Sequence, residues 1–349
     1  MENKASVKNA PATVAKIKAI HGKRLTEDNI SELLNCRSVP EAAEYLKNTE
    51  RYGEVLSSVD TNTVHRGMLE ALLRKAAFMS YIRITAFERL NKQEFYNFRI
   101  LRAEMEELLD CIRYMKAGSK AHIQTVPVYM NGYTSFDLIG LAQVHDYNRL
   151  LEFTEKTPYH NLLKFFEPDK RENIDYTGCE ARLRKYYFER LIGSAEGFSK
   201  EVSSSLKEFI GVQTDLINII NSFRMIKYFN AEADTIHRLM MPVSHLSADT
   251  LEGLYSSQNS IEFLKRLEKT YYGSLLQANG LDALEPEAAA LRLMCRNYKR
   301  ALSSTQAVPV AVYAFTHVME TEVSDIIRII EGIRYQIPKN DIEKLLIMF

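Results

Sequence analysis

The feature that most constrains the fold is a helical pattern of apolar side chains close to the end of the sequence. In residues 309–335, apolar residues recur at steps of three and four positions, which places them on one face of an α-helix: Val312, Phe315, Met319, Val323, Ile326, Ile327, Ile330 and Ile333. The charged residues between them are predicted to face water: Glu320, Asp325, Arg328, Glu331 and Arg334. Gly332 costs about 1 kcal/mol against alanine inside a helix. We therefore expect close packing at Gly332 or an early helix end.

Weaker copies of this helix occur twice earlier in the sequence. In the second copy, five residues match residues of the last helix at one offset of 107 positions (322 minus 215, 335 minus 228). The matches are Glu322 with Asp215, Asp325 with Asn218, Ile326 with Ile219, Ile327 with Ile220, and Tyr335 with Tyr228. The third copy, residues 94–99, aligns when Asn97 is set against Asn218, and it fits only over its opening turns. The pattern indicates an internal repeat of about 110 residues.

A second repeated element supports the same period. The segments RYGEVL, PYHNLL and YYGSLL contain Tyr52, Tyr159 and Tyr272, which are 107 (159 minus 52) and 113 (272 minus 159) residues apart. Two elements with one period predict three related helical units over residues 12–120, 121–232 and 233–349, after an N-terminal tail of residues 1–11.

Composition favours an all-α fold in which the three units are helical bundles. Only 9 prolines and 14 glycines interrupt 349 residues, and strong helix formers fill the intervals. Lys plus Arg and Asp plus Glu number 45 each, so no overall positive field favours nucleic acid as the main partner. The cysteines are isolated and no apolar leader core precedes them, which favours a reducing compartment: Cys36, Cys111, Cys179 and Cys295.

One segment approaches the length of a membrane span. Residues 301–319 have no formal charge, but they include serine, threonine, proline and histidine. We predict a polar loop over residues 303–306, followed by a helix that is buried on most sides, and no membrane insertion. Residues 125–129 (TVPVY) contain Pro127 and are predicted to link the first two units.

Motifs for chemistry are absent, so the sequence predicts no catalytic, cofactor-binding or metal-binding residue. It contains no phosphate loop, no dinucleotide fingerprint, no G-x-S-x-G and no H-E-x-x-H. Asp234 and His237 are predicted to form a surface contact, and Cys111 and Cys295 to be buried apolar residues. The basic residues at positions 182, 184, 185 and 190 are predicted to form a solvated face, and most aromatic residues to pack in the core.

Three segments carry a resemblance to a known family. The opening AKIKAIHGKRLTEDNISELLNCRSVPEAAEYLKNTERYGEVL, the segment EFYNFRILRAEMEELL and the ending PVAVYAFTHVMETEVSDIIRIIEGIRYQIPKNDIEKLL resemble the C subunit of the V-type (A-type) rotary ATPase. Its eukaryotic relative is the d subunit of the vacuolar ATPase. The resemblance extends over residues 12–346, and the ending is its most specific part.

The resemblance implies a funnel of three pseudo-threefold-related units around a central cavity. It also implies a non-catalytic subunit, one copy per complex, peripheral on the cytoplasmic face of the membrane. Its partners would be the proteolipid ring, through the cytoplasmic loops of the ring, and the D and F subunits of the central stalk. The protein would then transmit torque between ATP turnover and proton or sodium movement.

Two other classes remain open from the residues alone. A generic helical-repeat adaptor would show repeats of 34 to 47 residues rather than about 110. A helical enzyme would require a polar pocket that the sequence does not indicate.

Overall fold

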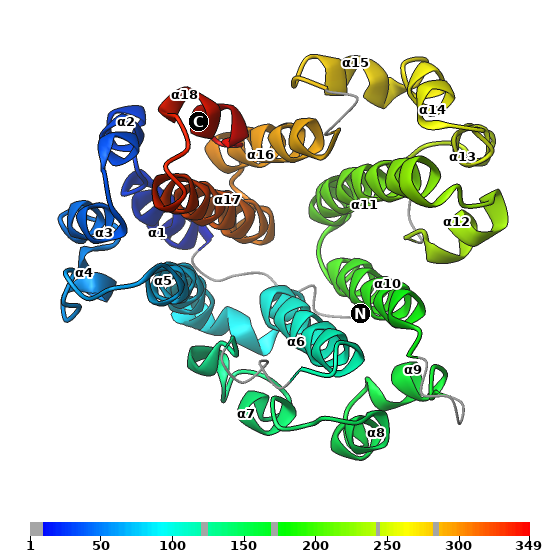
Figure 1. The fold of residues 1–349 in the computed structure, drawn as a ribbon, viewed down its shortest axis with the longest axis horizontal. Helices are drawn as coiled ribbons and strands as arrows, with labels where there is room; N and C mark the ends of the chain where they lie inside the picture. Colours follow the sequence, from blue (N-terminus) through cyan, green and yellow to red (C-terminus); the bar gives the residue numbers. More distant parts are fainter. Residues whose placement is uncertain (1–9, 120–124, 169–173, 242–244, 282–285) are drawn as a thin grey trace. The chain divides into compact units, whose positions relative to one another are not determined.

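The structure is a computed structural model that describes residues 10–119, 125–168, 174–241, 245–281 and 286–349. Over these residues the chain forms helices and connecting turns and no β-strand, as Figure 1 shows. The predicted all-α class is confirmed. The structure divides into two compact units, unit 1 with residues 1–92 and 275–349 and unit 2 with residues 93–274. The three units predicted over residues 12–120, 121–232 and 233–349 stay a prediction.

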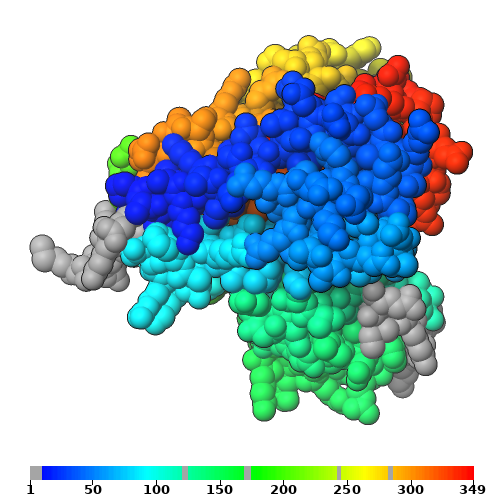
Figure 2. All heavy atoms as spheres, turned by 90° about the vertical axis from the view of Figure 1, so that its left-hand side faces the viewer, coloured from blue at the N-terminus to red at the C-terminus, as the bar shows by residue number. Residues whose placement is uncertain are grey.

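Unit 1 combines the two ends of the chain. Its helices are α1 (Ala10–Gly22), α2 (Glu27–Asn35), α3 (Val39–Lys47), α4 (Gly53–Leu56), α5 (Arg66–Ala86), the 3-10 segment η1 (Phe87–Lys92), α16 (Pro286–Ser304), α17 (Val308–Arg334) and α18 (Lys339–Leu345). The side chains of α1 to α5, in shades of blue, form one continuous surface in Figure 2. Both ends of the sequence must therefore be present before unit 1 can form.

Unit 2 is continuous in sequence. Its helices are η2 (Glu94–Asn97), α6 (Phe98–Lys116), η4 (Val128–Met130), α7 (Leu138–Leu141), α8 (Tyr147–Thr154), α9 (His160–Lys164), α10 (Tyr176–Ala195), α11 (Lys200–Phe229), α12 (Ala233–Leu239), α13 (Ala248–Tyr255) and α14 (Ser260–Leu267); α15 (Tyr271–Gln277) crosses the division between the units. The last two residues of the segment predicted as a linker, Val128 and Tyr129, belong to the short helix η4.

The short helices begin at residues whose side chains cap the helix. The Thr26 side chain accepts a hydrogen bond from the Asn29 N–H, and Asp146 and Asn259 cap α8 and α14 in the same way. These side chains satisfy backbone donors that the first helical turn leaves unpaired. The caps explain why the sequence breaks into short helices at these points.

Helix α17 is the centre of unit 1 and packs against α1, α5 and α16. It begins at Val308, and α16 ends at Ser304, so residues 303 and 304 of the predicted loop are helical and residues 305 and 306 are not. Over the described residues no helix is long and apolar enough to cross a membrane. A Cβ added at Gly332 would lie 2.4 Å from Ile342 Cδ1, so the close packing predicted at this glycine is confirmed.

The prediction that Asp325 faces water is wrong. Its side chain is buried, and its carboxylate accepts hydrogen bonds from the N–H groups of Ile347 and Met348 at 3.0 and 2.7 Å. Arg328, three residues further along the helix, places its Nη1 2.6 Å from Asp325 Oδ1. Because the last residues fold back onto α17, a charged position becomes part of the interior.

Unit 2 is built on α6, α10 and α11, which lie side by side in Figure 1. Helix α10 packs against both α6 and α11. Aromatic residues fill the interior as predicted: Phe95, Tyr96, Phe98, Tyr187 and Phe188 are buried. Tyr186 is only half-buried. The rings of Phe198 and Phe95 lie edge to face, with 5.3 Å between their centres. This arrangement adds to the packing energy of the aromatic interior.

Candidate functional site

Three buried carboxylates on long helices each accept a hydrogen bond from a buried tyrosine. Tyr52 donates to Glu322 on α17 at 2.8 Å, Tyr159 to Glu104 on α6 at 2.6 Å, and Tyr272 to Asp215 on α11 at 2.7 Å. The tyrosines are the three that the sequence repeat predicts as equivalent. Each pair connects a short helix to a long one.

Two of the carboxylates also accept a backbone N–H from a residue that precedes their tyrosine, Glu104 from Ser135 and Asp215 from His245. At the corresponding place in the third set, the backbone N–H of Leu25 lowers the pKa of Glu322. Leu25 and His245 each lie 27 residues before their tyrosine (52 minus 25, 272 minus 245), and Ser135 lies 24 before (159 minus 135). We call each set a tyrosine–carboxylate pair, defined by the carboxylate and the tyrosine that donates to it.

Burial controls the protonation of these pairs. Burial, the largest cause, raises the pKa of Glu322, and it raises the pKa values of Tyr52, Tyr159 and Tyr272 far above the ordinary range. With such a raised pKa, each tyrosine hydroxyl keeps its proton at neutral pH. Each carboxylate accepts a hydrogen bond from its tyrosine within the protein. A general acid or base needs access to a substrate, and Glu322 and Asp215 are fully buried, whereas Glu104 lines a cavity of unit 2.

The hydrogen bonds align the first copy of the long helix differently from the sequence repeat. The sequence sets Asn97 against Asn218, whereas the pairs match Glu104 with Asp215. Asn218 exchanges hydrogen bonds with the backbone of Met241, and Asp325 accepts from Met348. The two intervals are equal, since 241 minus 218 and 348 minus 325 both give 23.

Two long helices end with an exposed tyrosine that follows a basic residue. Tyr228 is 60% exposed with Lys227 Nζ 5.0 Å from its ring centre, and Tyr335 is 65% exposed with the Arg334 guanidinium 5.3 Å from its ring centre. Aromatic and basic side chains of this kind are common at protein interfaces. Periodicity reveals these residues, but it does not show that they face solvent.

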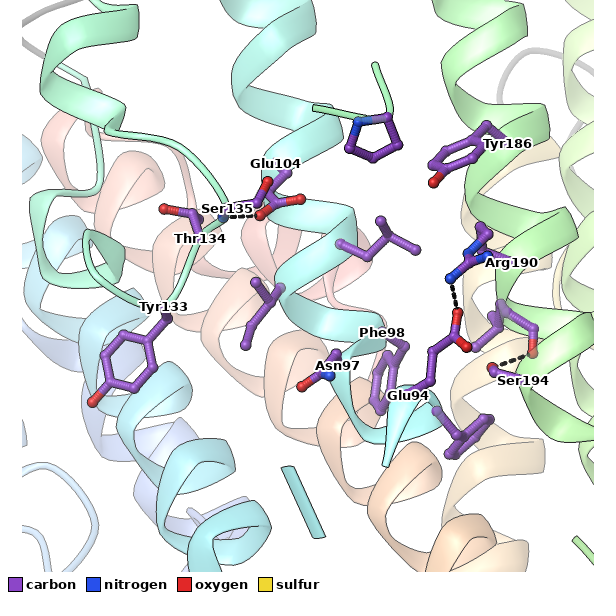
Figure 3. Close-up of a pocket in the computed structure, with 15 residues that line it drawn as sticks. Glu94, Asn97, Phe98, Glu104, Tyr133, Thr134, Ser135, Tyr186, Arg190 and Ser194 are labelled. Carbon is purple, nitrogen blue, oxygen red and sulfur yellow. Dashed lines mark hydrogen bonds and ion pairs between the residues drawn. The ribbon is translucent and has the colours of Figure 1, made fainter. Parts of the chain in front are cut away.

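A cavity of about 370 Å³ lies in unit 2, as Figure 3 shows. It is lined by η2 and the first turns of α6, by residues 133–135, by Pro158 and by α10. Arg190 and Glu94 form an ion pair within it, and the buried Glu104 lies beside Ser135. The sequence does not reveal this cavity, because its walls come from segments almost 100 residues apart.

The residues weighed for chemistry from the sequence have ordinary surroundings. Cys111 and Cys295 are buried as predicted, and burial raises the pKa values of their thiols to about 12 and about 11, so the reactive thiolate is disfavoured. His237 Nε2 lies 2.5 Å from a Glu252 oxygen, which is its side-chain partner instead of Asp234.

Arg190, predicted to lie on a solvated face, is half exposed and pairs with Glu94 across two helices, while Arg184 pairs with Glu180 at 2.9 Å on α10. Among the residues that the structure describes, no group of three His, Cys, Asp or Glu side chains is placed to hold a metal ion. The absence of catalytic, cofactor-binding and metal-binding residues stays a prediction.

Comparison with known proteins assigns the family. The model of the ATP synthase (C/AC39) subunit family matches residues 13–345, nearly the whole chain. The chain belongs to the ATP synthase (C/AC39) subunit family. The tyrosine–carboxylate pairs all lie within the residues that match this C/AC39 family.

Curated relatives within this family agree with the match. The C subunit of the A-type ATP synthase of Thermococcus kodakarensis is 22% identical over 264 residues, covering 75% of this chain and 68% of the relative. The C subunit of the A-type ATP synthase of Pyrococcus abyssi is 25% identical over 325 residues, covering 88% of this chain and 81% of the relative. The resemblance found in the sequence is therefore confirmed at the level of the family.

Proposed function

We propose that this protein is a non-catalytic central-rotor subunit of a V/A-type rotary ATPase. In this role it couples the central stalk to the proteolipid ring, so that ATP hydrolysis or synthesis is linked to proton or sodium translocation. The observation that carries the proposal is the family match over residues 13–345. The curated relatives support it, because each is named as the C subunit of an A-type ATP synthase.

The physical character of the chain suits a part that transmits force. Long helices form the interior, α11 with 30 residues and α17 with 27. Close-packed interiors have low compressibility and transmit strain. The tyrosine–carboxylate pairs hold the short helices on the long ones through buried hydrogen bonds, which rigidify a fold when they are satisfied.

The proposal includes the partners and the place of the protein. One copy would lie peripherally on the cytoplasmic face of the membrane, with the cytoplasmic loops of the proteolipid ring on one side and the D and F subunits of the stalk on the other. The three predicted units would form a funnel whose central cavity receives the stalk. No direct membrane insertion, nucleic acid or cofactor is part of this role.

The test is a complex assembled without this chain. ATP hydrolysis and ion pumping are measured in membranes from cells that lack the protein and in membranes from the same cells supplied with it again. We expect hydrolysis to lose its connection to pumping without the protein and to regain it on return. Ion pumping that is unchanged in membranes without the protein would refute the proposal.

A further inference from the structure

Helix α1 fills a groove between two long helices of unit 1. It packs against α17 and α5, and Thr13, Val14 and Ile17 are its buried residues. Near the C-terminal end of α1, the carbonyl of Ile20 accepts a hydrogen bond from Arg51 Nη1 at 3.1 Å. The rings of His21 and of Phe315 on α17 lie edge to face, with 6.5 Å between their centres. The helix is therefore seated by both apolar and polar contacts, and Figure 1 shows it beside α17.

Unit 2 contains the matching groove between α6 and α10. Helix α6 carries Glu104 as α17 carries Glu322, and α10 follows the helix of Tyr159 as α5 follows the helix of Tyr52. Both grooves therefore have one wall that bears the carboxylate and one wall that comes next in the chain after the tyrosine. Helices α6 and α10 pack against each other, as α17 and α5 do.

The residues that surround α1 have counterparts around the cavity of unit 2. Asn97 lies seven residues before Glu104, as Phe315 lies seven before Glu322 (104 minus 97, 322 minus 315). Pro158 precedes its tyrosine directly, as Arg51 does. Asn97 and Pro158 both line the cavity of about 370 Å³, and so does Ser135, the backbone donor of this pair. Within the described part of unit 2, the cavity thus lies where unit 1 holds α1.

We propose that the groove between α6 and α10 is the docking site for one α-helix of a partner protein, which lies there as α1 lies in unit 1. The proposal rests on the proposed function, because the partner is another subunit of the same complex. Helix α1 has 13 residues, so the bound segment spans about 20 Å at a rise of 1.5 Å per residue. Its buried face carries small and aliphatic side chains, as Thr13, Val14 and Ile17 do in α1.

Charge specifies the partner helix further. In unit 1, Arg51 Nε lies 3.0 Å from the buried carboxylate of Glu322. The counterpart Pro158 brings no charge to Glu104, and Arg190, the basic residue of the cavity lining, pairs with Glu94. A lysine or arginine near the C-terminal end of the partner helix would supply the missing cation. A buried carboxylate gains more from such a pairing than an exposed one does.

The test places a photo-crosslinking amino acid, p-benzoylphenylalanine, at Ser194 in the full chain within the assembled complex. Ser194 lies on α10 and lines the cavity, whereas Arg182 lies on the exposed surface of the same helix outside the cavity and is the matched control position. After irradiation of the purified complex, mass spectrometry identifies the crosslinked peptide. We expect position 194 to crosslink to a helical segment with a basic residue in another subunit, and position 182 to give no crosslink to that segment.

Three outcomes would overturn the inference. They are no crosslink from position 194, a crosslink to a second copy of this chain, and a crosslink to a segment that is not helical. If the chain still co-purifies with the complex and pumping stays coupled, only the docking inference fails. If the chain does not co-purify with the complex, the proposed function fails as well.

Discussion

At the residue scale, the hydroxyl groups of three tyrosines connect the short helices to the long helices. Tyr272 is 1% exposed and donates to Asp215, whereas its neighbour Tyr271 is 70% exposed. The two differ in burial but not in chemistry, so they form a natural comparison. Removing one donor from a buried carboxylate leaves part of its charge unsatisfied.

We expect Tyr272→Phe to lower the free energy of unfolding by about 1.5–3 kcal/mol, because a hydrogen bond to a buried charge is lost. The matched control Tyr271→Phe should change it by less than about 0.5 kcal/mol, as exposed substitutions do. Chemical denaturation of the purified chain measures both. Equal effects of the two substitutions would show that the buried hydrogen bond contributes no stability.

The second residue-scale prediction concerns pH. His21 on α1 has its pKa lowered from 6.5 to about 4, chiefly by burial and then by the charges of Arg24, Arg51 and Lys299. A depressed pKa means that the folded state binds fewer protons than the unfolded state between these values, so stability falls as pH falls from 6.5 to 4. The contribution of His21 is fully present above pH 6.5.

Between pH 6.5 and 4 we therefore expect the free energy of unfolding to decrease less in His21→Gln than in the parent chain. Chemical denaturation at several pH values measures this decrease. In the unfolded chain the exposed imidazole of His21 binds a proton from solvent over this pH range, whereas a glutamine side chain does not. His237→Gln is the control, since this histidine is about half exposed and lies outside α1. A pH dependence that is unchanged in His21→Gln would contradict the assignment.

The sequence repeats mark all three tyrosines of the tyrosine–carboxylate pairs but only two of the carboxylates, Glu322 and Asp215. Tyr52, Tyr159 and Tyr272 stand out because an identical residue recurs in similar surroundings. Glu104 does not stand out, because it lies 111 residues from Asp215 (215 minus 104) rather than 107, which breaks the common offset. Periodicity also assigns Asp325 to solvent, because only the distant residues Ile347 and Met348 supply the hydrogen bonds that permit its burial.

At the element scale, two glycines within helices have opposite surroundings. A Cβ at Gly332 of α17 would lie 2.4 Å from Ile342 of α18, whereas a Cβ at Gly193 of α10 would meet nothing within 4 Å. Gly332 thus allows α18 to approach α17. Gly193 has no such role in packing.

We expect Gly332→Ala to lower the free energy of unfolding by about 1–3 kcal/mol, because overpacking outweighs the better helix propensity of alanine. Gly193→Ala should raise it by up to about 1 kcal/mol through propensity alone. Thermal unfolding of the two variants beside the parent chain measures this difference in sign. A stabilising Gly332→Ala would mean that Ile342 moves aside freely.

The long helices could be predicted from the sequence, while their grouping could not. Apolar spacing marks α17 because 27 residues give the pattern many turns in which to appear. The predicted start of α17 is correct to within a residue, but the preceding loop is shorter at its start than predicted, because α16 extends through Ser304. The cavity between α6 and α10 depends on tertiary packing, for which periodicity carries no signal.

At the scale of the whole molecule, the proposed role predicts a definite pattern of association. We expect the protein to co-purify with proteolipid and stalk subunits from detergent-solubilised membranes, and to leave the membranes when the soluble head and stalk are stripped. Immunoblotting of the washed membranes and of the wash checks this, with the proteolipid as the control that remains. Retention of the protein on fully stripped membranes would contradict a purely peripheral position.

The division of unit 1 between the two ends of the chain has a consequence for biosynthesis. Tyr52 and Glu322, which form its tyrosine–carboxylate pair, are 270 residues apart in sequence. Unit 2 is complete when residue 274 has left the ribosome, whereas residues 10–92 must wait for the final quarter of the message to be translated. During that interval the apolar faces of α1 and α5 lack α17, the helix that covers them in the finished protein. We expect the nascent chain to depend on chaperones at this stage and a stalled one to aggregate through its N-terminal helices.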